Sequence, residues 1–472
     1  MSKLYKPFRP LAITASALAA TFFVTGCSLM PAYERPAAPI APQWPGAASS
    51  AQPSPASVQA AALPDWRSFF ADPTLQALIT AALANNRDLR VATLNIEQAR
   101  AQLGLRRADQ FPTVNATLTG SRTPSDGSIK SAYAGGLTIT AYELDFFGRV
   151  ASLKEQALAQ YLATQEAALA AQISLMATVA QSWLALLADE ELLATSRQTM
   201  AAREDSLKLV ELKVKHGASS DLEWRLAQTL RESARATLAQ QQRQRALDEN
   251  ALTLLLGQPL PASAQGALRA TQQGGLARQQ FAPLPAGLPS DLLTHRPDIR
   301  QAEQALIAAN ANIGAARAAF FPRISLTTGV GSASSELSGL FKDGSWGWTL
   351  SPQLLLPIFD AGRNQSNLDG ARVTRDIAVA QYEKAIQSAF REVADALATR
   401  DTLALQLQAT QALLTAESER AHLTQLRFDA GAASQLETLD AQRSLFAAQQ
   451  ALVQTRLAVL QNQIALFKAL GG

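Results

Sequence analysis

Two long stretches of the chain repeat apolar residues at intervals of three and four, the spacing of one face of a helix. One run is made of Ile173, Met176, Ala180, Trp183 and Leu187, and another of Ile386, Phe390, Val393 and Leu397. Residues 125–258 and 358–472 contain no proline, the residue that most strongly interrupts helices. The pattern therefore predicts very long helices that pack as in a coiled coil.

Each helical stretch opens at a Gly-Arg pair and contains a glycine near its middle. The pairs begin at Gly148 and Gly362, and the internal glycines are Gly217 and Gly431. Glycine often ends a helix because it adopts left-handed backbone angles without steric cost. We therefore expect two antiparallel helices in each stretch, and residues 363–427 alone would extend roughly 95 Å at 1.5 Å per residue.

Shorter segments alternate apolar and polar residues, which predicts strands. The four strands are expected at 114–118, 137–141, 324–330 and 346–354, with a polar turn around 124–127 in the first pair. A helix precedes each pair, at about 75–108 and 290–319, and ends at a Phe-Pro dipeptide. Alternation over about ten residues with one polar face is typical of an outer-membrane strand. A soluble hairpin packed on helices is the alternative.

The elements occur twice because the sequence is duplicated. Residues 88–120 align with residues 298–330 at an offset of 210, and the identities include glycines, arginines and a Phe-Pro pair. Residues 212–223 align with residues 426–437 at an offset of 214. We therefore define a first copy, residues 75–257, and a second copy, residues 285–472.

Four strands per chain are too few to close a barrel, since the smallest membrane barrels have about eight. Unpaired backbone groups in hydrocarbon cost several kcal/mol each, so open sheet edges are excluded from a membrane. If these strands lie in a membrane, several chains must pool them, and three chains would supply about 12. The strand count therefore predicts an oligomer.

The N-terminus has the features of a lipoprotein signal. A basic segment with Lys3, Lys6 and Arg9 precedes an apolar stretch, and residues 1–26 end in Val-Thr-Gly before Cys27. This arrangement is similar to a bacterial lipobox, in which the cysteine receives the lipid; an ordinary buried cysteine is the alternative. Residues 27–74 are rich in proline, alanine and serine and are expected to form an extended, lipid-anchored tether.

The composition argues against nucleic-acid binding and against an enzyme. The formal charge is +3, but removing the three basic signal residues leaves 39 basic against 39 acidic residues. The histidines, His216, His295 and His422, lie outside catalytic and zinc motifs. With a single cysteine and four methionines, we expect no metal site and no cofactor other than a covalent lipid on Cys27. The sequence contains no apolar run of 18 or more residues, so we expect no membrane-spanning helix.

Several motifs resemble the outer-membrane efflux factors of the TolC superfamily, in the OprM/NodT-type lipoprotein branch. They are LPSDLLTHRPDIR at 288–300, ANANIG at 309–314, FFP at 320–322, LDAQRSL at 439–445 and ALGG at 469–472. The resemblance implies a mainly α fold with a small β part. Long antiparallel helical hairpins would form a trimeric periplasmic α-barrel, joined to a 12-stranded outer-membrane β-barrel with four strands from each chain.

The resemblance also implies a function and partners. The chain would be the outer-membrane channel of a tripartite efflux pump that passively conducts drugs and toxic organics. Its partners would be two further copies, a periplasmic membrane-fusion adaptor, an inner-membrane RND-type transporter and outer-membrane lipid. An exit channel for secreted proteins and a periplasmic coiled-coil lipoprotein without a pore are the alternatives.

In this family, carboxylates near the hairpins ring a closed periplasmic aperture. By motif position they fall on Glu437 and Asp440, with Glu223 as the first-copy counterpart of Glu437. Glu437 and Asp440 are also i, i+3 neighbours on one helical face. Solvated surface charges are the alternative interpretation.

The hairpin tips depart from the best-known member of that family at two positions. Phe428 and Ala433 stand where a tyrosine and an arginine lock the aperture. Candidates for a replacement lock are Arg427, Asp429 and Lys213. The expected adaptor-docking residues at the two tips are Gly217, Ala218, Ser220, Gly431, Ala432 and Ser434. A tight turn that merely requires glycine is the alternative.

Overall fold

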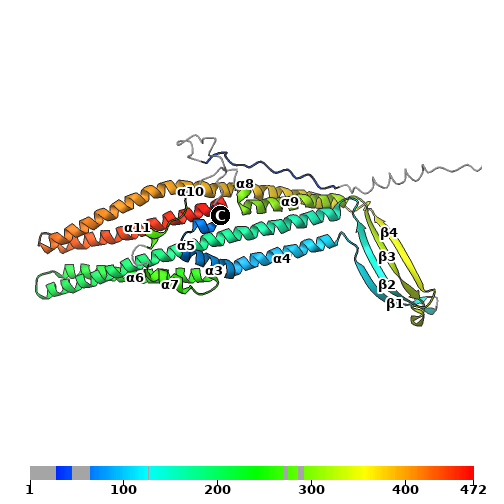
Figure 1. Cartoon of the computed structure of the whole chain (residues 1–472), viewed down its shortest axis with the longest axis horizontal. Helices are drawn as coiled ribbons and strands as arrows, with labels where there is room; N and C mark the ends of the chain where they lie inside the picture. The colour runs from blue at the N-terminus through cyan, green and yellow to red at the C-terminus, as the bar shows by residue number, and fades with distance from the viewer. Residues whose placement is uncertain (1–27, 45–63, 126, 271–274, 285–291) are drawn as a thin grey trace, which may run out of the picture. The chain divides into compact units, whose positions relative to one another are not determined.

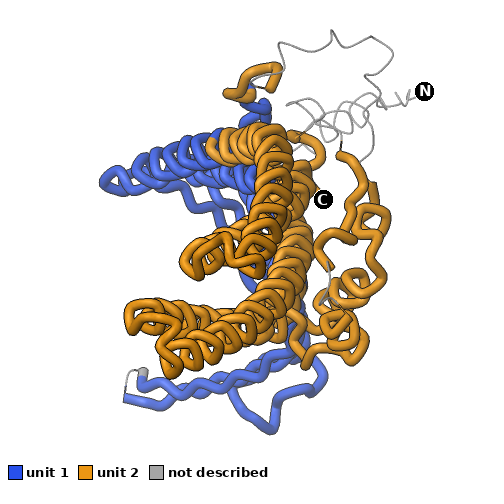
Figure 2. The backbone as a smooth tube through the Cα atoms, turned by 90° about the vertical axis from the view of Figure 1, so that its left-hand side faces the viewer, with its two compact units in different colours: residues 1–37, 95–165, 301–383 blue, residues 38–94, 166–300, 384–472 orange. Residues whose placement is uncertain are grey.

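The structure is a computed structural model that describes residues 28–44, 64–125, 127–270, 275–284 and 292–472. The predicted signal peptide, residues 1–26, and Cys27 lie outside the described residues. The chain, drawn in Figure 1, divides into two compact units, which Figure 2 shows in different colours. Unit 1 contains residues 1–37, 95–165 and 301–383, and unit 2 contains residues 38–94, 166–300 and 384–472.

Unit 1 contains one antiparallel sheet of four strands in the order β1-β2-β3-β4 (Figure 1). The strands are β1 (Val114–Ser125), β2 (Ser128–Leu144), β3 (Arg323–Ser334) and β4 (Trp346–Leu355). The four predicted strands are confirmed, although all extend beyond the predicted bounds. The first turn is tighter than predicted, because Ser125 already pairs with Ser128. The pairing of β2 with β3 joins the two sequence copies.

The sheet has one apolar and one polar face across all four strands. On the apolar face, Ala116 pairs with Leu137, Leu137 with Val330, and Val330 with Trp348. The next row on the opposite face is Asn115, Thr138, Gly329 and Thr349. Within the described sheet, β1 and β4 each have one neighbour and therefore one unpaired edge.

The helices that precede the strands are each divided in two, which the sequence analysis did not predict. The expected helix at 75–108 is α3 (Pro73–Asn85) followed by α4 (Arg87–Ala108). Asn86 separates them, since its Oδ1 accepts a hydrogen bond from Leu89 N at 2.9 Å and caps α4. The expected helix at 290–319 is α8 (Leu292–His295) and α9 (Pro297–Ala318). Proline at the first position of α9 prevents a continuous helix.

The long helical stretches form as predicted. They are α5 (Arg149–Lys215) with α6 (Asp221–Leu256), and α10 (Arg363–Asp429) with α11 (Gln435–Leu470) (Figure 1). Helices α5 and α10 each have 67 residues, or about 100 Å at 1.5 Å per residue. The turns lie at the predicted glycines, Gly217 and Gly431, whose φ angles are 72° and 73°.

The largest apolar core lies in unit 2, where α5, α6 and α11 pack around short segments. Phe69, at the end of α2 (Trp66–Phe69), stacks on Phe467 with ring centroids 4.5 Å apart. Buried Trp183 and Leu184 of α5 belong to the same core. By length and composition α5 is apolar enough to cross a membrane, but 44% of its most apolar window is buried. Core helices pass the same test, so this is weak evidence for a spanning helix.

Short elements complete the described fold. Unit 2 also contains α7 (Ala262–Ala270) and the 3-10 turn η3 (Leu276–Arg278), and unit 1 contains the 3-10 turn η5 (Leu337–Gly339). Phe281 pairs with Phe70 by an isolated bridge and packs against the aromatic core of unit 2. In unit 2, Leu268 of α7 and Leu276 of η3 are buried in this core.

Candidate functional site

The two hairpin tips are tight turns with the same backbone pattern. Ala218 N donates to Lys213 O at 2.8 Å, and Ala432 N donates to Arg427 O at 2.8 Å. Both bonds span five residues and cap the preceding helix, with glycine in the left-handed conformation between them. The turn alone explains why glycine is needed at these positions. Adaptor docking at the six tip residues therefore stays a prediction.

Glu223 and Glu437 occupy the same position in their hairpins, three residues after the serine that caps each helix. Ser220 caps α6 with Glu223, and Ser434 caps α11 with Glu437, each through a reciprocal capping box. A hydrogen bond from the Ser219 hydroxyl and another from the Ser220 backbone lower the pKa of Glu223. The predicted aperture carboxylates thus also begin the returning helices.

Arginines contact the carboxylates of the second hairpin at exposed positions. Arg443 Nη2 donates to Asp440 Oδ1 at 2.6 Å, and Arg420 Nη1 donates to Asp440 Oδ2 at 3.4 Å. Arg427 Nη1 lies 3.6 Å from Glu437 Oε2. The spacing of Asp440 and Arg443 marks an i, i+3 ion pair in the sequence. The contact from Arg420 crosses between α10 and α11, so no local spacing reveals it.

One of the three candidate lock residues joins the two hairpins in the described structure. Lys213 Nζ, near the end of α5, lies 4.8 Å from the centre of the Phe428 ring in α10. A lysine over an aromatic face is attracted to the ring quadrupole. Arg427 instead donates to Ala432 O within its own hairpin, and Asp429 accepts from Gln425 of its own helix. Phe428, which stands where the resemblance implies a tyrosine, thus contacts Lys213 of the other hairpin.

Unit 2 also buries a carboxyl group that the sequence analysis missed. Asp189 of α5 is buried beside Asp248 of α6. Burial and the neighbouring Asp248 carboxyl raise the pKa of Asp189 to about 8, although Arg245 opposes the shift. Asp189 therefore holds a proton at neutral pH. Among the described residues, no group of three or more His, Cys, Asp or Glu side chains is placed to hold a metal ion.

The first residues of the predicted extended tether are docked on unit 1. The strap, residues 28–35, is extended and lies along α9. Arg35 donates to both carboxylate oxygens of buried Glu303, Nε to Oε1 at 2.7 Å and Nη2 to Oε2 at 2.9 Å. Tyr33 OH donates to the same Oε1 at 3.0 Å. Burial and the bond to Glu303 raise the pKa of Tyr33, so its hydroxyl stays a donor.

Two backbone carbonyls fix the direction of the strap. Asn310 Nδ2 donates to Pro31 O at 2.8 Å, and Arg317 Nη1 donates to Leu29 O at 3.2 Å. The strap therefore runs antiparallel to α9, and its first residues lie beside the end of α9 that leads into β3. Composition alone could not reveal this, because every partner is more than 260 residues away in sequence.

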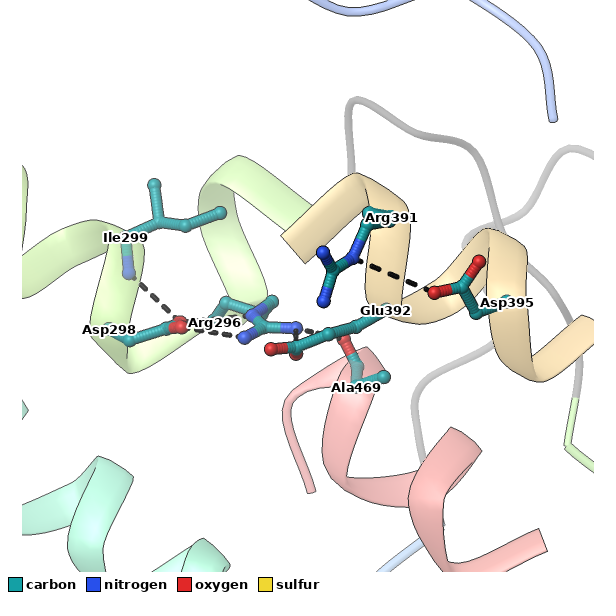
Figure 3. Close-up of polar contacts among 7 residues, drawn as sticks. All are labelled: Arg296, Asp298, Ile299, Arg391, Glu392, Asp395 and Ala469. Carbon is teal, nitrogen blue, oxygen red and sulfur yellow. Dashed lines mark hydrogen bonds and ion pairs between the residues drawn. The ribbon is translucent and has the colours of Figure 1, made fainter. Parts of the chain in front are cut away.

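The Arg-Pro-Asp segment, which is part of the family resemblance, connects several helices of unit 2 through hydrogen bonds of Arg296 (Figure 3). Arg296 is buried and donates through Nε and Nη2 to the two carboxylate oxygens of Asp298, at 2.9 and 2.6 Å. Its Nη1 donates to Glu392 Oε2 at 2.7 Å and to Ala469 O at 2.9 Å. The motif thus ties α9 and α10 to the end of α11, and the cation also suits the negative end of the α11 dipole.

Comparisons with known proteins agree with this architecture. The family model described as "Outer membrane efflux protein" matches residues 78–258 and 288–472. The chain is 47% identical over 462 residues to "Solvent efflux pump outer membrane protein SrpC" of Pseudomonas putida, covering 96% of this chain and 97% of the relative. It is 46% identical over 475 residues to "Outer membrane protein OprJ" of Pseudomonas aeruginosa, covering 98% and 96%.

Solved structures show the same fold. The open state of the Neisseria gonorrhoeae MtrE outer membrane channel is 40% identical, with a TM-score of 0.85 over 94% of this chain and 98% of that one. The OprN outer-membrane channel is 26% identical, with a TM-score of 0.81 over 94% and 99%. The shared fold includes the long hairpins and the four-stranded sheet. The chain belongs to the outer membrane efflux protein family.

Proposed function

We propose that this chain is the channel subunit of a tripartite efflux pump in a bacterial outer membrane. One observation carries the proposal: a single chain contains both a sheet with one apolar and one polar face and helical hairpins about 100 Å long. Such a chain spans a bilayer with its strands and crosses aqueous space with its helices. Its relatives are named for solvent, toluene and antibiotic efflux pumps.

The unpaired edges of β1 and β4 support a homotrimer. An exposed edge in hydrocarbon leaves backbone groups unsatisfied, at several kcal/mol each. Pairing β4 of one subunit with β1 of the next removes both edges, and three subunits with four strands each close a barrel of 12. The polar face then lines a water-filled lumen, through which small molecules such as drugs and toxic organics pass passively.

The docked strap supports lipid attachment at Cys27. Leu29 lies beside Arg317, near the end of α9 that leads into β3. The first described residues of the strap thus lie near the base of the sheet, where the strands would enter the membrane, which suits a lipid on the preceding cysteine. Attachment there needs only a short reach into the inner leaflet, and the lipid adds to the anchoring that the barrel provides.

At the other end, the hairpin tips provide an entrance. Three copies of Glu437 and Asp440, with Glu223, would place a ring of carboxylates at the periplasmic aperture and favour cations. The small tip residues, Gly217 and Gly431 among them, would let an adaptor helix approach closely. The adaptor connects the channel to an inner-membrane transporter of the RND type, which supplies the energy and most of the substrate selectivity.

Gene deletion tests the proposal. We expect the deletion strain to accumulate more of a hydrophobic fluorescent dye than the parent and to become more sensitive to toluene. Expression of the wild-type chain should restore both phenotypes, and restoration should fail when the strand residue Thr328 is replaced by proline, which cannot donate a ladder hydrogen bond. Unchanged dye accumulation and toluene sensitivity after deletion would contradict an efflux function.

A further inference from the structure

The two β-hairpins of unit 1 are closed in different ways, although they belong to two copies of one sequence. Strands β1 and β2 are joined by a tight turn, because Ser125 already pairs with Ser128. Strands β3 and β4 are joined by the β3–β4 loop, residues 335–345, which contains η5. The first hairpin shows that the sheet needs no such loop to connect two strands. The longer connection therefore calls for a further role.

The β3–β4 loop folds back on the apolar face of the sheet. It lies over one row of paired residues, which are Leu118, Gly135, Ser332 and Trp346. This row is two residues along each strand from the apolar row described above, so its side chains share that face. A Cβ atom added to Gly135 would lie 3.2 Å from Cζ of the Phe341 ring. The ring therefore occupies the space that a side chain at Gly135 would take.

Hydrogen bonds of Ser332 hold the loop in this place. Phe341 N donates to Ser332 Oγ at 3.0 Å, and Ser332 Oγ donates to Ser345 Oγ at 2.7 Å. Ser345 Oγ in turn donates to Lys342 O at 2.6 Å. Ser332 is only 2% exposed. A hydroxyl on the apolar face of a membrane sheet would find no partner in hydrocarbon, and the loop supplies its partners.

The backbone of Phe341 shows that these contacts impose its position. Its φ angle is 71°, in the left-handed region that a bulky residue rarely adopts. Such strain persists only where the surrounding structure holds the residue. Besides covering Gly135, the Phe341 ring lies 6.1 Å from the Trp346 ring, measured between centroids. The contacts on the apolar face therefore outweigh the cost of the strained backbone.

We propose that the β3–β4 loop is an outward-folded loop that contacts the lipid of the outer leaflet and stays clear of the channel exit. The inference rests on the proposed function, which turns the apolar face toward lipid. Strand β3 follows α9 and β4 leads into α10, so the loop lies at the end of the sheet away from these helices. Leu337, Phe341 and Trp346 are 62%, 57% and 61% exposed there. They continue the apolar face to the lipid–water interface, where tryptophan is enriched.

Fluorescence quenching tests the lipid contact. The variant Leu337→Cys, labelled with a thiol-reactive fluorophore in trimers in phospholipid vesicles, should be quenched more by nitroxide-labelled lipid than by iodide in the water. Wild-type protein treated with the same reagent gives the background from Cys27. Adding Gly135→Leu, whose side chain would displace the Phe341 ring, should reverse the order of the quenchers. The matched control is Gly347→Leu on the polar face, where a Cβ atom would meet nothing within 4 Å.

A second variant tests the same contact from the loop. Phe341→Ala, at an exposed position, removes the ring and leaves the backbone angles of the loop as strained as before. Less than half of the ring area is buried, so we expect roughly a fivefold larger undocked fraction of the loop. Trypsin cleavage after Lys342 on whole cells should accelerate by the same factor. If Gly135→Leu yields no trimers, Phe341→Ala decides alone.

The outcomes separate this inference from the proposed function. Equal lipid quenching in the Gly135→Leu and Gly347→Leu proteins, or an unchanged cleavage rate in Phe341→Ala, would overturn the docked position. Stronger quenching by iodide in the Leu337→Cys protein would place the loop in water, and quenching by neither agent would show that a neighbouring subunit covers it. Either result would overturn the lipid contact and leave the channel intact. The absence of trimers from wild-type membranes would overturn the proposed function, and this inference with it.

Discussion

Replacing Arg35 with alanine tests whether the strap is a fixed part of the fold. The side chain of Glu303 is 9% exposed, and Arg35 holds it with two charge-assisted hydrogen bonds of 2.7 and 2.9 Å. Tyr33 provides a single further bond to the same carboxylate. In the Arg35→Ala variant the docked strap would cover a carboxylate without a counter-charge. Undocking would return that carboxylate to water.

The cost follows from the burial of Glu303. Removing one partner of a buried ion pair costs about 3–5 kcal/mol, because the other charge stays desolvated. The Tyr33 bond and the half-exposed position of Arg35 lower this to about 3 kcal/mol. A difference of about 1.4 kcal/mol corresponds to tenfold in an equilibrium constant. We therefore expect roughly a 100-fold larger undocked fraction of the strap in the variant.

Proteolysis of the native protein measures this fraction, since cleavage of an opened segment follows its population when opening is fast. Chymotrypsin cleavage after Tyr33, normalised to a synthetic peptide of residues 28–44 with the same substitution, should accelerate by roughly 100-fold. The matched control is Arg106→Ala. Arg106 is 49% exposed, close to the 51% of Arg35, but its partner Asp109 is 50% exposed.

Exposed ion pairs contribute about 0–1 kcal/mol, so the Arg106→Ala variant should be cleaved at the wild-type rate. The reasoning would be refuted if the Arg35→Ala and Arg106→Ala variants were cleaved at the same rate. It would also be refuted if wild-type protein were cleaved as fast as the peptide, because the strap would then not be docked at all.

Three further predictions concern the periplasmic helices. Lys213→Met should raise the open probability of single channels by about tenfold or more, since three cation–π contacts of about 0.5–1 kcal/mol each are lost and about 1.4 kcal/mol corresponds to tenfold. Lys215→Met breaks a pair within its own helix and should leave the open probability unchanged. Glu437→Gln should reduce cation selectivity, read as a smaller reversal potential in a salt gradient; an unchanged potential argues against the aperture assignment. Asp189→Asn should stabilise the protein above pH 4, by on the order of 4 kcal/mol at pH 7. The reason is that folding favours the neutral acid, so the wild-type protein loses stability as the pH rises to about 8. Thermal unfolding of the two proteins across this pH range tests the prediction, and a constant difference between their unfolding temperatures would contradict it.

The long helices were predictable from the sequence because their evidence is local. Apolar spacing around Trp183, the absence of proline and the turn glycines each act over a few residues, and the structure places α5 and α10 within two residues of the predicted bounds. Strand alternation identified all four strands for the same reason. The duplication then fixed which elements correspond, including the hairpin residues Glu223 and Glu437.

What the sequence did not reveal depends on contacts between distant segments. Glu303 looks like a surface residue of a helix until Arg35 and Tyr33 cover it, and the composition around Arg35 and Tyr33 suggested only an extended tether. Asp189 reads as one of three consecutive acids, and only its burial beside Asp248 distinguishes it. The division of the first helix at Asn86 did have a local signal, since asparagine is a preferred cap, but the apolar spacing on both sides concealed it.

The central claim is that copies of this chain pool their strands into one water-filled channel. Single-channel recording of purified trimers in planar lipid bilayers tests it most directly. We expect discrete conductance steps from trimer fractions, a shift in reversal potential when Glu437 is neutralised, and no steps from heat-dissociated monomers. A bilayer that stays silent with folded trimers, or steps of equal size from monomers, would contradict it.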